Sequence, residues 1–162
     1  MSKAPPYWIT AKNYLSKKDD ILKSLIKKYK DNHLRTRKDV FYSLCKSIVG
    51  QQISVAAADS VFKKFENACS KKINPKVVSK LKVSQLKKCG LSRQKIRGIL
   101  EMSQRFKDKT FNPRLISKMS DEEAIEYLST LRQIGRWSAE MILLFTYNRS
   151  NIWPVQDIGL LR

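Results

Sequence analysis

The sequence predicts an all-α protein, and three observations lead to this fold class. Apolar residues recur at helical spacing along nearly the whole 162-residue chain. No segment alternates apolar and polar residues as a half-buried strand does. The five glycines lie mostly between the expected helices rather than inside them. We therefore expect about eight or nine short helices and no sheet.

The first half of the chain is expected to hold three helices. Apolar residues at helical spacing predict helices over 10–29 and 38–49. Ser54 is a suitable N-cap for a third helix over 55–66, because its hydroxyl can accept a hydrogen bond from the first turn. Residues 50–53, Gly-Gln-Gln-Ile, separate the second helix from the third.

Start signals are clear in the middle of the chain. Asn74-Pro75 combines an N-cap with proline at the first helical position, and it predicts a short helix over 75–81. A second short helix is expected over 84–89, where Gly90 suits its C-terminal end. Ser92 then caps a longer helix over 93–107.

The last two expected helices form a pair joined by a tight turn. The segment Ser120 to Glu123 fits a capping box that opens a helix through Leu131. Gly135 interrupts the pattern, and helix resumes over about 137–147. Such a turn exposes backbone N–H groups at the start of the second helix, where the helix dipole also favours an anion.

Charge is the most unusual feature of the composition. Lys and Arg number 33 against 14 Asp and Glu, which gives a net charge of +19. An excess of this size acts as self-repulsion in a compact protein unless an anionic partner offsets it. We therefore expect nucleic acid as the partner. A lysine-rich surface that is simply solvated is the alternative.

The composition also excludes several classes of protein. Hydrophobic residues make up 42% of the chain, which is too many for a disordered tail. No apolar run approaches the roughly 18–20 residues of a membrane span, so no membrane partner is expected. Cys45, Cys69 and Cys89 form no CxxC, which argues against a zinc site and a disulfide framework. With His33 as the only histidine, any chemistry has to rest on carboxylates, amides or lysine.

One carboxylate near the C-terminal end is a candidate reactive group. Pro154 stiffens the chain there, and Asp157 falls where a new helix would begin. A carboxylate at a helix N-terminus is favoured in its ionised form by the dipole and by backbone donors. From these residues alone, the alternative is that Asp157 only caps that helix.

These segments resemble a known family. The stretch LRQIGRWSAEMILLF (131–145), followed by PVQDIGLLR (154–162), is similar to the helix-hairpin-helix (HhH-GPD) DNA glycosylase superfamily. The resemblance is greatest to the alkylpurine branch, the 3-methyladenine DNA glycosylase II type. Segments 47–56 and 90–96 also resemble that branch. The matches cover most of the chain in the order that the family has.

The resemblance implies a fold, a reaction and a partner. The fold is a two-lobed helical domain over 1–162, with the helix-hairpin-helix at about 121–147. The reaction is hydrolysis of the N-glycosidic bond of alkylated purines such as 3-methyladenine, which leaves an abasic site in base excision repair. The partner is double-stranded DNA with alkylated bases, bound by a monomer. The location is the nucleoid in a prokaryotic cytoplasm, or the nucleus of a eukaryote.

The resemblance also implies the catalytic and pocket residues. An Asp shortly beyond the hairpin is catalytic in this family, and Asp157 takes that place. Bifunctional relatives carry a catalytic Lys where this chain has Trp137, so we expect no lyase step. Trp137 is implied to line the base pocket, since an indole face attracts a cationic base; packing in the core or within the hairpin is the alternative. Met141 stands where some relatives have a pocket aromatic.

Further matches concern contacts with DNA. Gln52 is implied to be the side chain that intercalates, with Gln51 beside it, and capping of the next helix is the alternative. Gly135, Arg136 and Ser138 are implied to bind a phosphate 3′ of the lesion, chiefly through backbone N–H groups. A basic cluster is implied to form a phosphate track, with a solvated face as the alternative: Lys87, Lys88, Arg93, Lys95 and Arg97.

The hairpin turn differs from the usual family pattern. In family members a monovalent cation such as K⁺ or Na⁺ bridges hairpin carbonyls and a phosphate. The carbonyls of Ser129, Leu131 and Ile134 match those positions, and no other cofactor is expected. Gln133 stands where glycine is usual, so we expect a strained turn.

The C-terminal end differs as well. Arg162 lies five residues beyond Asp157, whereas family members continue with further helices behind the catalytic residue. We therefore expect a fold truncated after Asp157 and a carboxylate that is poorly fixed. Two alternative functions stay open at this point: a non-catalytic helix-hairpin-helix DNA-binding protein, and a glycosylase with AP lyase activity on oxidised bases.

Overall fold

The structure is a computed structural model that describes residues 4–34 and 39–161. These residues form nine α-helices and one 3₁₀-helix, without β-strands, which confirms the predicted all-α class. The chain divides into two compact units, Met1–Arg37 and Lys38–Arg162, and each is described by itself.

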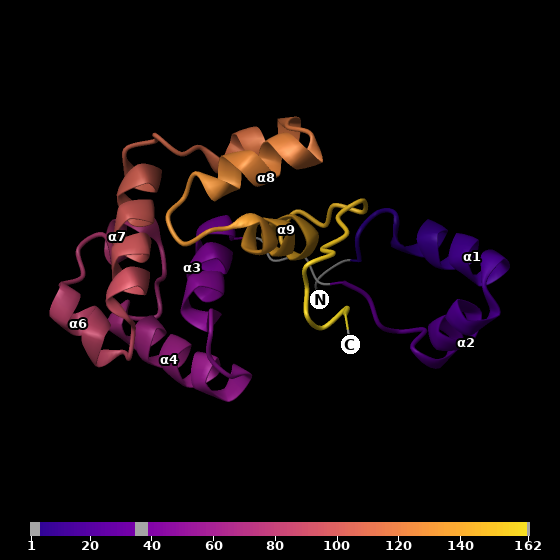
Figure 1. Ribbon diagram of the computed structural model, residues 1–162, viewed down its shortest axis with the longest axis horizontal. Coiled ribbons are helices and arrows are strands. Elements are labelled where there is room, and N and C mark those ends of the chain that lie inside the picture. The colour runs from indigo at the N-terminus through magenta and orange to yellow at the C-terminus, as the bar shows by residue number, and fades with distance from the viewer. Residues whose placement is uncertain (1–3, 35–38, 162) are drawn as a thin grey trace. The chain divides into compact units, whose positions relative to one another are not determined.

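The first unit is a pair of helices, α1 (Trp8–Lys18) and α2 (Asp20–Lys28), which pack on each other (Figure 1). The single helix predicted over 10–29 is wrong, because the structure interrupts it at Asp19. The backbone of Asp19 is extended, and its carboxylate accepts a hydrogen bond from the Leu22 N–H at 2.8 Å. An N-cap therefore divides an otherwise continuous helical pattern.

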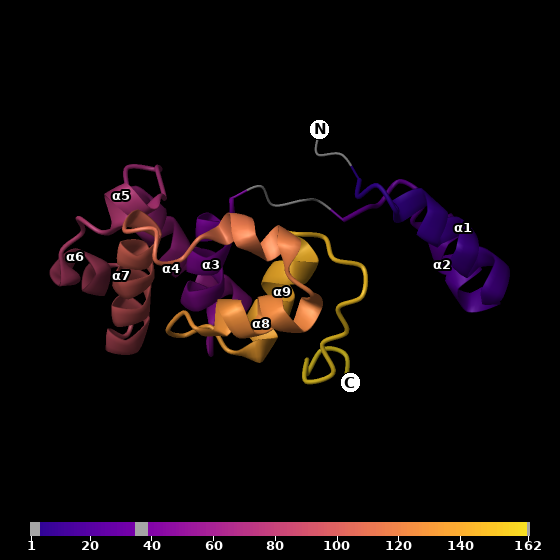
Figure 2. The same cartoon turned by 90° about the horizontal axis from the view of Figure 1, so that it is seen from above.

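The second unit is built around α3. Its helices in chain order are α3 (Val40–Gly50), α4 (Val55–Ala68), α5 (Pro75–Val78), α6 (Val83–Lys88), α7 (Arg93–Lys107), the 3₁₀-helix η1 (Pro113–Lys118), α8 (Asp121–Ser129) and α9 (Arg136–Phe145). Helix α3 contacts α4, α7 and α9. Figures 1 and 2 show α4 to α7 on one side of α3, with α8 and α9 on the other. This is the two-lobed arrangement expected from the sequence.

Most helix starts agree with the sequence, and besides the start of α2 one element was missed. Ser54, Asn74, Ser92 and Ser120 each accept a hydrogen bond from a backbone N–H of the first turn, as expected of N-caps. The unpredicted element is η1, which begins at Asn112-Pro113. That dipeptide repeats the start signal at Asn74-Pro75, so the sequence did contain the information.

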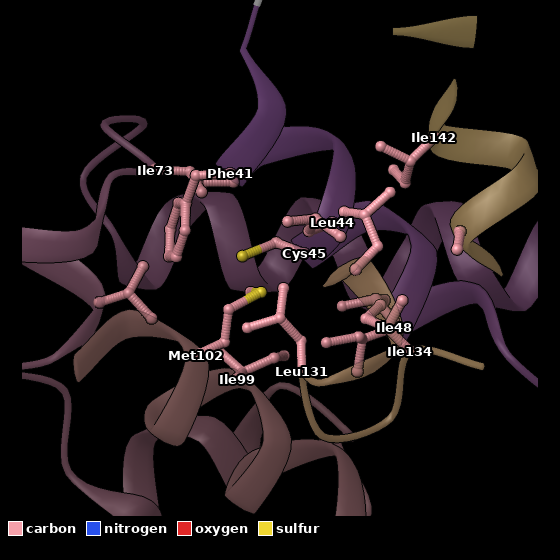
Figure 3. Packing of buried hydrophobic residues seen from close by; sticks show 14 of the residues in the cluster. Phe41, Leu44, Cys45, Ile48, Ile73, Ile99, Met102, Leu131, Ile134 and Ile142 are labelled. Atoms are coloured by element: carbon pink, nitrogen blue, oxygen red, sulfur yellow. The ribbon is translucent and has the colours of Figure 1, made fainter. Parts of the chain in front are cut away.

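The core of the second unit fixes the position of the α8–α9 hairpin. Leu44 and Ile48 of α3 meet Ile99 of α7 and Leu131 of the turn between α8 and α9 (Figure 3). These four side chains are fully buried. Ile134, also in the turn, is buried in the same cluster. The turn is therefore anchored in the main core, and it is not a free surface loop.

The three cysteines belong to this core. Cys45, Cys69 and Cys89 are buried and free, so they form no disulfide. Burial raises the pKa of all three thiols, that of Cys69 to about 11. Among residues 4–34 and 39–161, no group of His, Cys, Asp and Glu is arranged to hold a metal. Within those same ranges, no helix is long and apolar enough to cross a membrane.

Candidate functional site

The turn between α8 and α9 is tight and partly strained. The Ile134 N–H donates to the Leu131 carbonyl at 3.0 Å. Gln133 has a φ of 69°, in the left-handed region that favours glycine, so the strain expected from the sequence is present. Gly135 follows as the N-cap of α9, and it has no side chain to cap the first N–H groups of that helix.

Helix α7 approaches this turn through Gly98. A Cβ atom at Gly98 would lie 2.7 Å from Gln133 Cγ and 3.2 Å from the Arg132 carbonyl oxygen. Both distances are shorter than ordinary van der Waals contact. Glycine at this position therefore allows the strained turn to sit directly on α7.

We predict that Gly98→Ala lowers the free energy of unfolding by about 1–3 kcal/mol, because the added methyl group overpacks the turn. The measurement is urea unfolding. Gly50→Ala is the matched control, since a Cβ there would meet only Ala58 Cβ at 3.9 Å. Adding Gln133→Gly should recover much of the loss. Equal stability of the two alanine variants would contradict this account.

The structure brings Asp157 to the first turn of α9. Trp137 Nε1 donates a hydrogen bond to Asp157 Oδ2 at 2.8 Å. The Gly159 N–H donates to Asp157 Oδ1 at 2.7 Å. The expectation of a poorly fixed carboxylate is thus corrected, because each oxygen has a donor within the described residues. These two contacts hold the acidic group beside the hairpin.

The predicted helix start at Asp157 is wrong. The Asp157 carbonyl accepts hydrogen bonds from the N–H groups of Leu160 and Leu161, at 2.9 and 3.2 Å. The structure assigns turns and no helix to this segment. The Asp157 carboxylate still accepts a hydrogen bond from a following backbone N–H, as an N-cap does. The donor is Gly159, and the segment forms a single turn instead of a helix.

Trp137 has a polar edge toward Asp157 and an exposed ring. The residue is 42% exposed, so the alternative of a core tryptophan is wrong. Met141, one turn further along α9, is partly buried. A hydrogen bond at the N–H edge of an indole does not itself occupy the faces of the ring.

The two glutamines of the α3–α4 loop differ in their surroundings. Gln51 Nε2 donates to the Gln133 carbonyl at 2.7 Å and lies 3.4 Å from Ser138 Oγ. Gln52 is exposed, with a φ of 57°. The amide of Gln51 is thus engaged at the hairpin, and the DNA contact implied for Gln51 stays a prediction. Gln52 remains the candidate for intercalation.

The side chain of Arg136 also has internal partners. Its guanidinium binds both oxygens of Glu122 on α8, with Nη2 at 2.9 Å from Oε2, and its Nε lies 3.1 Å from Glu140 Oε1. Hydrogen bonding with Glu122 raises the pKa of Arg136 and lowers that of Glu122. The guanidinium therefore joins α8 to α9, and the backbone N–H of Arg136 lies in the first turn of α9, where the helix dipole favours an anion.

Ser138 and Lys95 are used inside the protein as well. Ser138 is buried, with its hydroxyl near the Gln51 amide. Lys95 Nζ donates to the carbonyls of Val49 and Gln51, at 2.8 and 2.7 Å. Burial lowers the pKa of Lys95. The ammonium of Lys95 therefore has two partners inside the protein, and the phosphate contact implied for it stays a prediction.

One cation of the hairpin was missed by sequence reasoning. Arg132 lies in the turn, and its buried Nε has no hydrogen-bond partner among the described residues. Arg132 also lines a shallow pocket of about 470 Å³ together with Glu101 and the other residues of 129–135. Its place in the turn, directly before Gln133, was the available signal.

The match to a protein family covers most of the second unit. Residues 45–162 match the HhH-GPD superfamily of base excision DNA repair proteins. The chain belongs to this superfamily. The matched residues include Asp157 and the α8–turn–α9 segment, which the sequence predicts to be the hairpin of this family.

Individual relatives agree with the family assignment. The chain is 27% identical to DNA-3-methyladenine glycosylase 1 of Schizosaccharomyces pombe over 160 residues, which covers 93% of this chain and 68% of the relative. It is 32% identical to the alkylbase DNA glycosidase-like protein mag2 of the same yeast, covering 93% of this chain and 73% of the relative.

A solved structure is similar in fold. The DNA-3-methyladenine glycosidase of Bacillus halodurans superposes with a TM-score of 0.75 at 28% sequence identity. The match covers 81% of this chain and 61% of the Bacillus protein, so this HhH-GPD chain spans about three fifths of that relative.

Proposed function

We propose that this protein is a monofunctional DNA glycosylase that hydrolyses the N-glycosidic bond of alkylated purines such as 3-methyladenine. The product is an abasic site in double-stranded DNA, the first intermediate of base excision repair. The observation that carries the proposal is the Asp157 carboxylate held at the HhH-GPD hairpin by Trp137, at 2.8 Å. The names of the relatives, which are 3-methyladenine and alkylbase glycosylases, support the substrate class.

The proposed mechanism needs one carboxylate. Cleavage of the glycosidic bond proceeds through a transition state that resembles an oxocarbenium ion, with positive charge on the sugar. The ionised Asp157 stabilises that charge electrostatically and orients the attacking water. An alkylated purine already carries positive charge and departs without a general acid. This agrees with a chain that has a single histidine, His33.

The pocket for the extruded base is proposed to lie against Trp137. Enzymes that act on a base within a duplex extrude it into a pocket and stack it on apolar or aromatic side chains. The exposed indole ring offers a face to the cationic base, an interaction of about 0.5–2 kcal/mol depending on desolvation. Met141, one turn away on the same helix, is proposed to line the side of this pocket.

The hairpin is proposed to bind the backbone of the DNA. The N–H groups of the first turn of α9, at residues 136–138, carry the positive end of the helix dipole. Arg132, whose Nε has no hydrogen-bond partner among the described residues, adds a cationic side chain at the same turn. Together with the net charge of +19, these groups support binding that does not depend on sequence.

A monovalent cation at the hairpin is a further part of the proposal. Ser129, Leu131 and Ile134, whose carbonyls match the family's ligands, line one pocket with Glu101. Neutral carbonyl oxygens beside a carboxylate suit a hard monovalent ion such as K⁺ or Na⁺. When bound, the ion would supply positive charge for a DNA phosphate. We propose no other cofactor.

We propose that the protein acts as a monomer. We also propose that it is located in the compartment that holds the DNA. That place is the nucleoid in the cytoplasm of a prokaryote, or the nucleus of a eukaryote. The side chain proposed to fill the space left by the extruded base is Gln52, which is exposed beside the hairpin-bound Gln51.

The deciding experiment is mass analysis of free bases released from methylated duplex DNA. We expect release of 3-methyladenine, and alkali-dependent cleavage at the resulting abasic sites. Borohydride should trap no covalent adduct, because Trp137 occupies the position of the lyase lysine. DNA binding without base release would instead indicate a non-catalytic binding protein, and a trapped adduct would indicate a lyase.

A further inference from the structure

Lys95 caps the end of α3 from another helix. Its ammonium donates to the carbonyls of Val49 and Gln51, in and just after the last turn of α3. The last carbonyls of a helix lack partners within the helix, and a cation is favourable at that end. Lys95 sits near the start of α7, so this contact joins α7 to the α3–α4 loop.

Gln51 continues the connection from this loop to the hairpin. Its backbone carbonyl is bound by Lys95, and its side-chain amide donates to the Gln133 carbonyl at 2.7 Å. Gln133 in turn sits directly against Gly98, one turn beyond Lys95 on α7. The loop, α7 and the hairpin thus form a closed set of contacts.

The contacts of Lys95 and Gln51 also restrain the backbone next to Gln52. It directly follows Gln51, its φ of 57° turns the chain sharply, and Ser54 caps α4 two residues later. Its side chain is exposed, while the Gln51 carbonyl before it accepts from Lys95 and the Ser54 hydroxyl after it accepts from the Ala57 N–H. A side chain on such a support has a defined direction relative to the hairpin.

We propose that Lys95 and Gln51 are positioning residues that fix the intercalating Gln52 at a set distance from the phosphate-binding hairpin. This inference rests on the proposed function. It assigns to Lys95 a role that differs from a phosphate contact, since two carbonyls already occupy its ammonium. Without the contacts of Lys95 and Gln51, the hairpin still binds the DNA backbone. Gln52, however, no longer enters the base stack at the right distance from the bound phosphate.

The test compares Lys95→Met and Gln51→Met with the unchanged protein. Binding is measured to an abasic-site duplex and to an intact duplex between about 50 and 200 mM salt, where a phosphate contact contributes about 0.9 to the log–log slope. We expect both variants to lose about tenfold of their preference for the abasic duplex. The slope should stay unchanged. A 2-aminopurine base beside the abasic site should show less unstacking with either variant.

Controls separate the possible outcomes. Lys107→Met removes the same charge from an exposed position on α7 and should keep the full preference. Far-ultraviolet circular dichroism and urea unfolding check that each variant folds, and Gln51→Met serves if Lys95→Met does not fold. A slope lower by about 0.9 with unchanged preference would overturn the inference and make Lys95 a phosphate contact. If the unchanged protein neither prefers the abasic duplex nor releases bases, the proposed function itself fails.

Discussion

Asp157→Asn is expected to reduce base release by at least about 100- to 1000-fold, because a neutral amide does not stabilise the positive sugar of the transition state. Binding to an abasic-site duplex should stay close to that of the unchanged protein. The change keeps the size of the side chain, and the remaining oxygen can still accept a hydrogen bond from Trp137. The measurement is the single-turnover rate of base release from methylated DNA.

The matched control is Asp108→Asn. Asp108 is exposed at the end of α7, and its contact with Gln104 lies within that helix end. The control should release bases at the full rate. A full rate for Asp157→Asn as well would remove Asp157 from the mechanism, whereas loss of folding in Asp157→Asn would show as an altered urea transition.

Trp137→Phe is expected to have the second largest effect. It removes the N–H donor to Asp157 Oδ2 and keeps an aromatic face for the cationic base. A hydrogen bond to a charged group is worth about 1.5–3 kcal/mol, so we expect the release rate to fall about 10- to 100-fold. Affinity for methylated DNA should change little. Trp137→Ala, which removes the ring as well, should weaken both.

Trp153→Phe is the matched control, because it makes the same substitution at a tryptophan that does not hydrogen-bond to Asp157. Trp153 is 75% exposed, and no hydrogen bond of its indole is present among the described residues. Its phenylalanine variant should keep the release rate of the unchanged protein. A rate for Trp137→Phe equal to this control would mean that the indole N–H does not position the carboxylate.

Much of the fold could be predicted from local sequence signals, chiefly the residues that begin helices. Ser54, Ser92 and Ser120 begin helices where expected, because N-capping depends on residues only two or three positions apart. The break at Asp19 was hidden by apolar residues that keep helical spacing on both sides of it. Helical periodicity alone does not distinguish one helix from two that share a stripe.

The candidate site depends instead on contacts between distant segments. Gln51 and Gln133 are 82 residues apart, and neither position carries a sign of its partner in the sequence. Motif matching therefore located Asp157 and Trp137 as separate candidates, without the hydrogen bond that joins them. It also assigned Lys95 to DNA, since a lysine in a basic cluster looks the same whether its ammonium is free or bound.

The burial of the cysteines matters because such an enzyme works in the presence of alkylating reagents. Reagents that methylate purines are electrophiles, and they attack sulfur nucleophiles in proteins too; the reactive form of cysteine is the thiolate. Cys45, Cys69 and Cys89 are enclosed in the core with pKa values above the ordinary one, so near neutral pH they remain protonated and shielded. The folded protein is thereby protected at its cysteine thiols from the kind of chemical exposure that produces its proposed substrates.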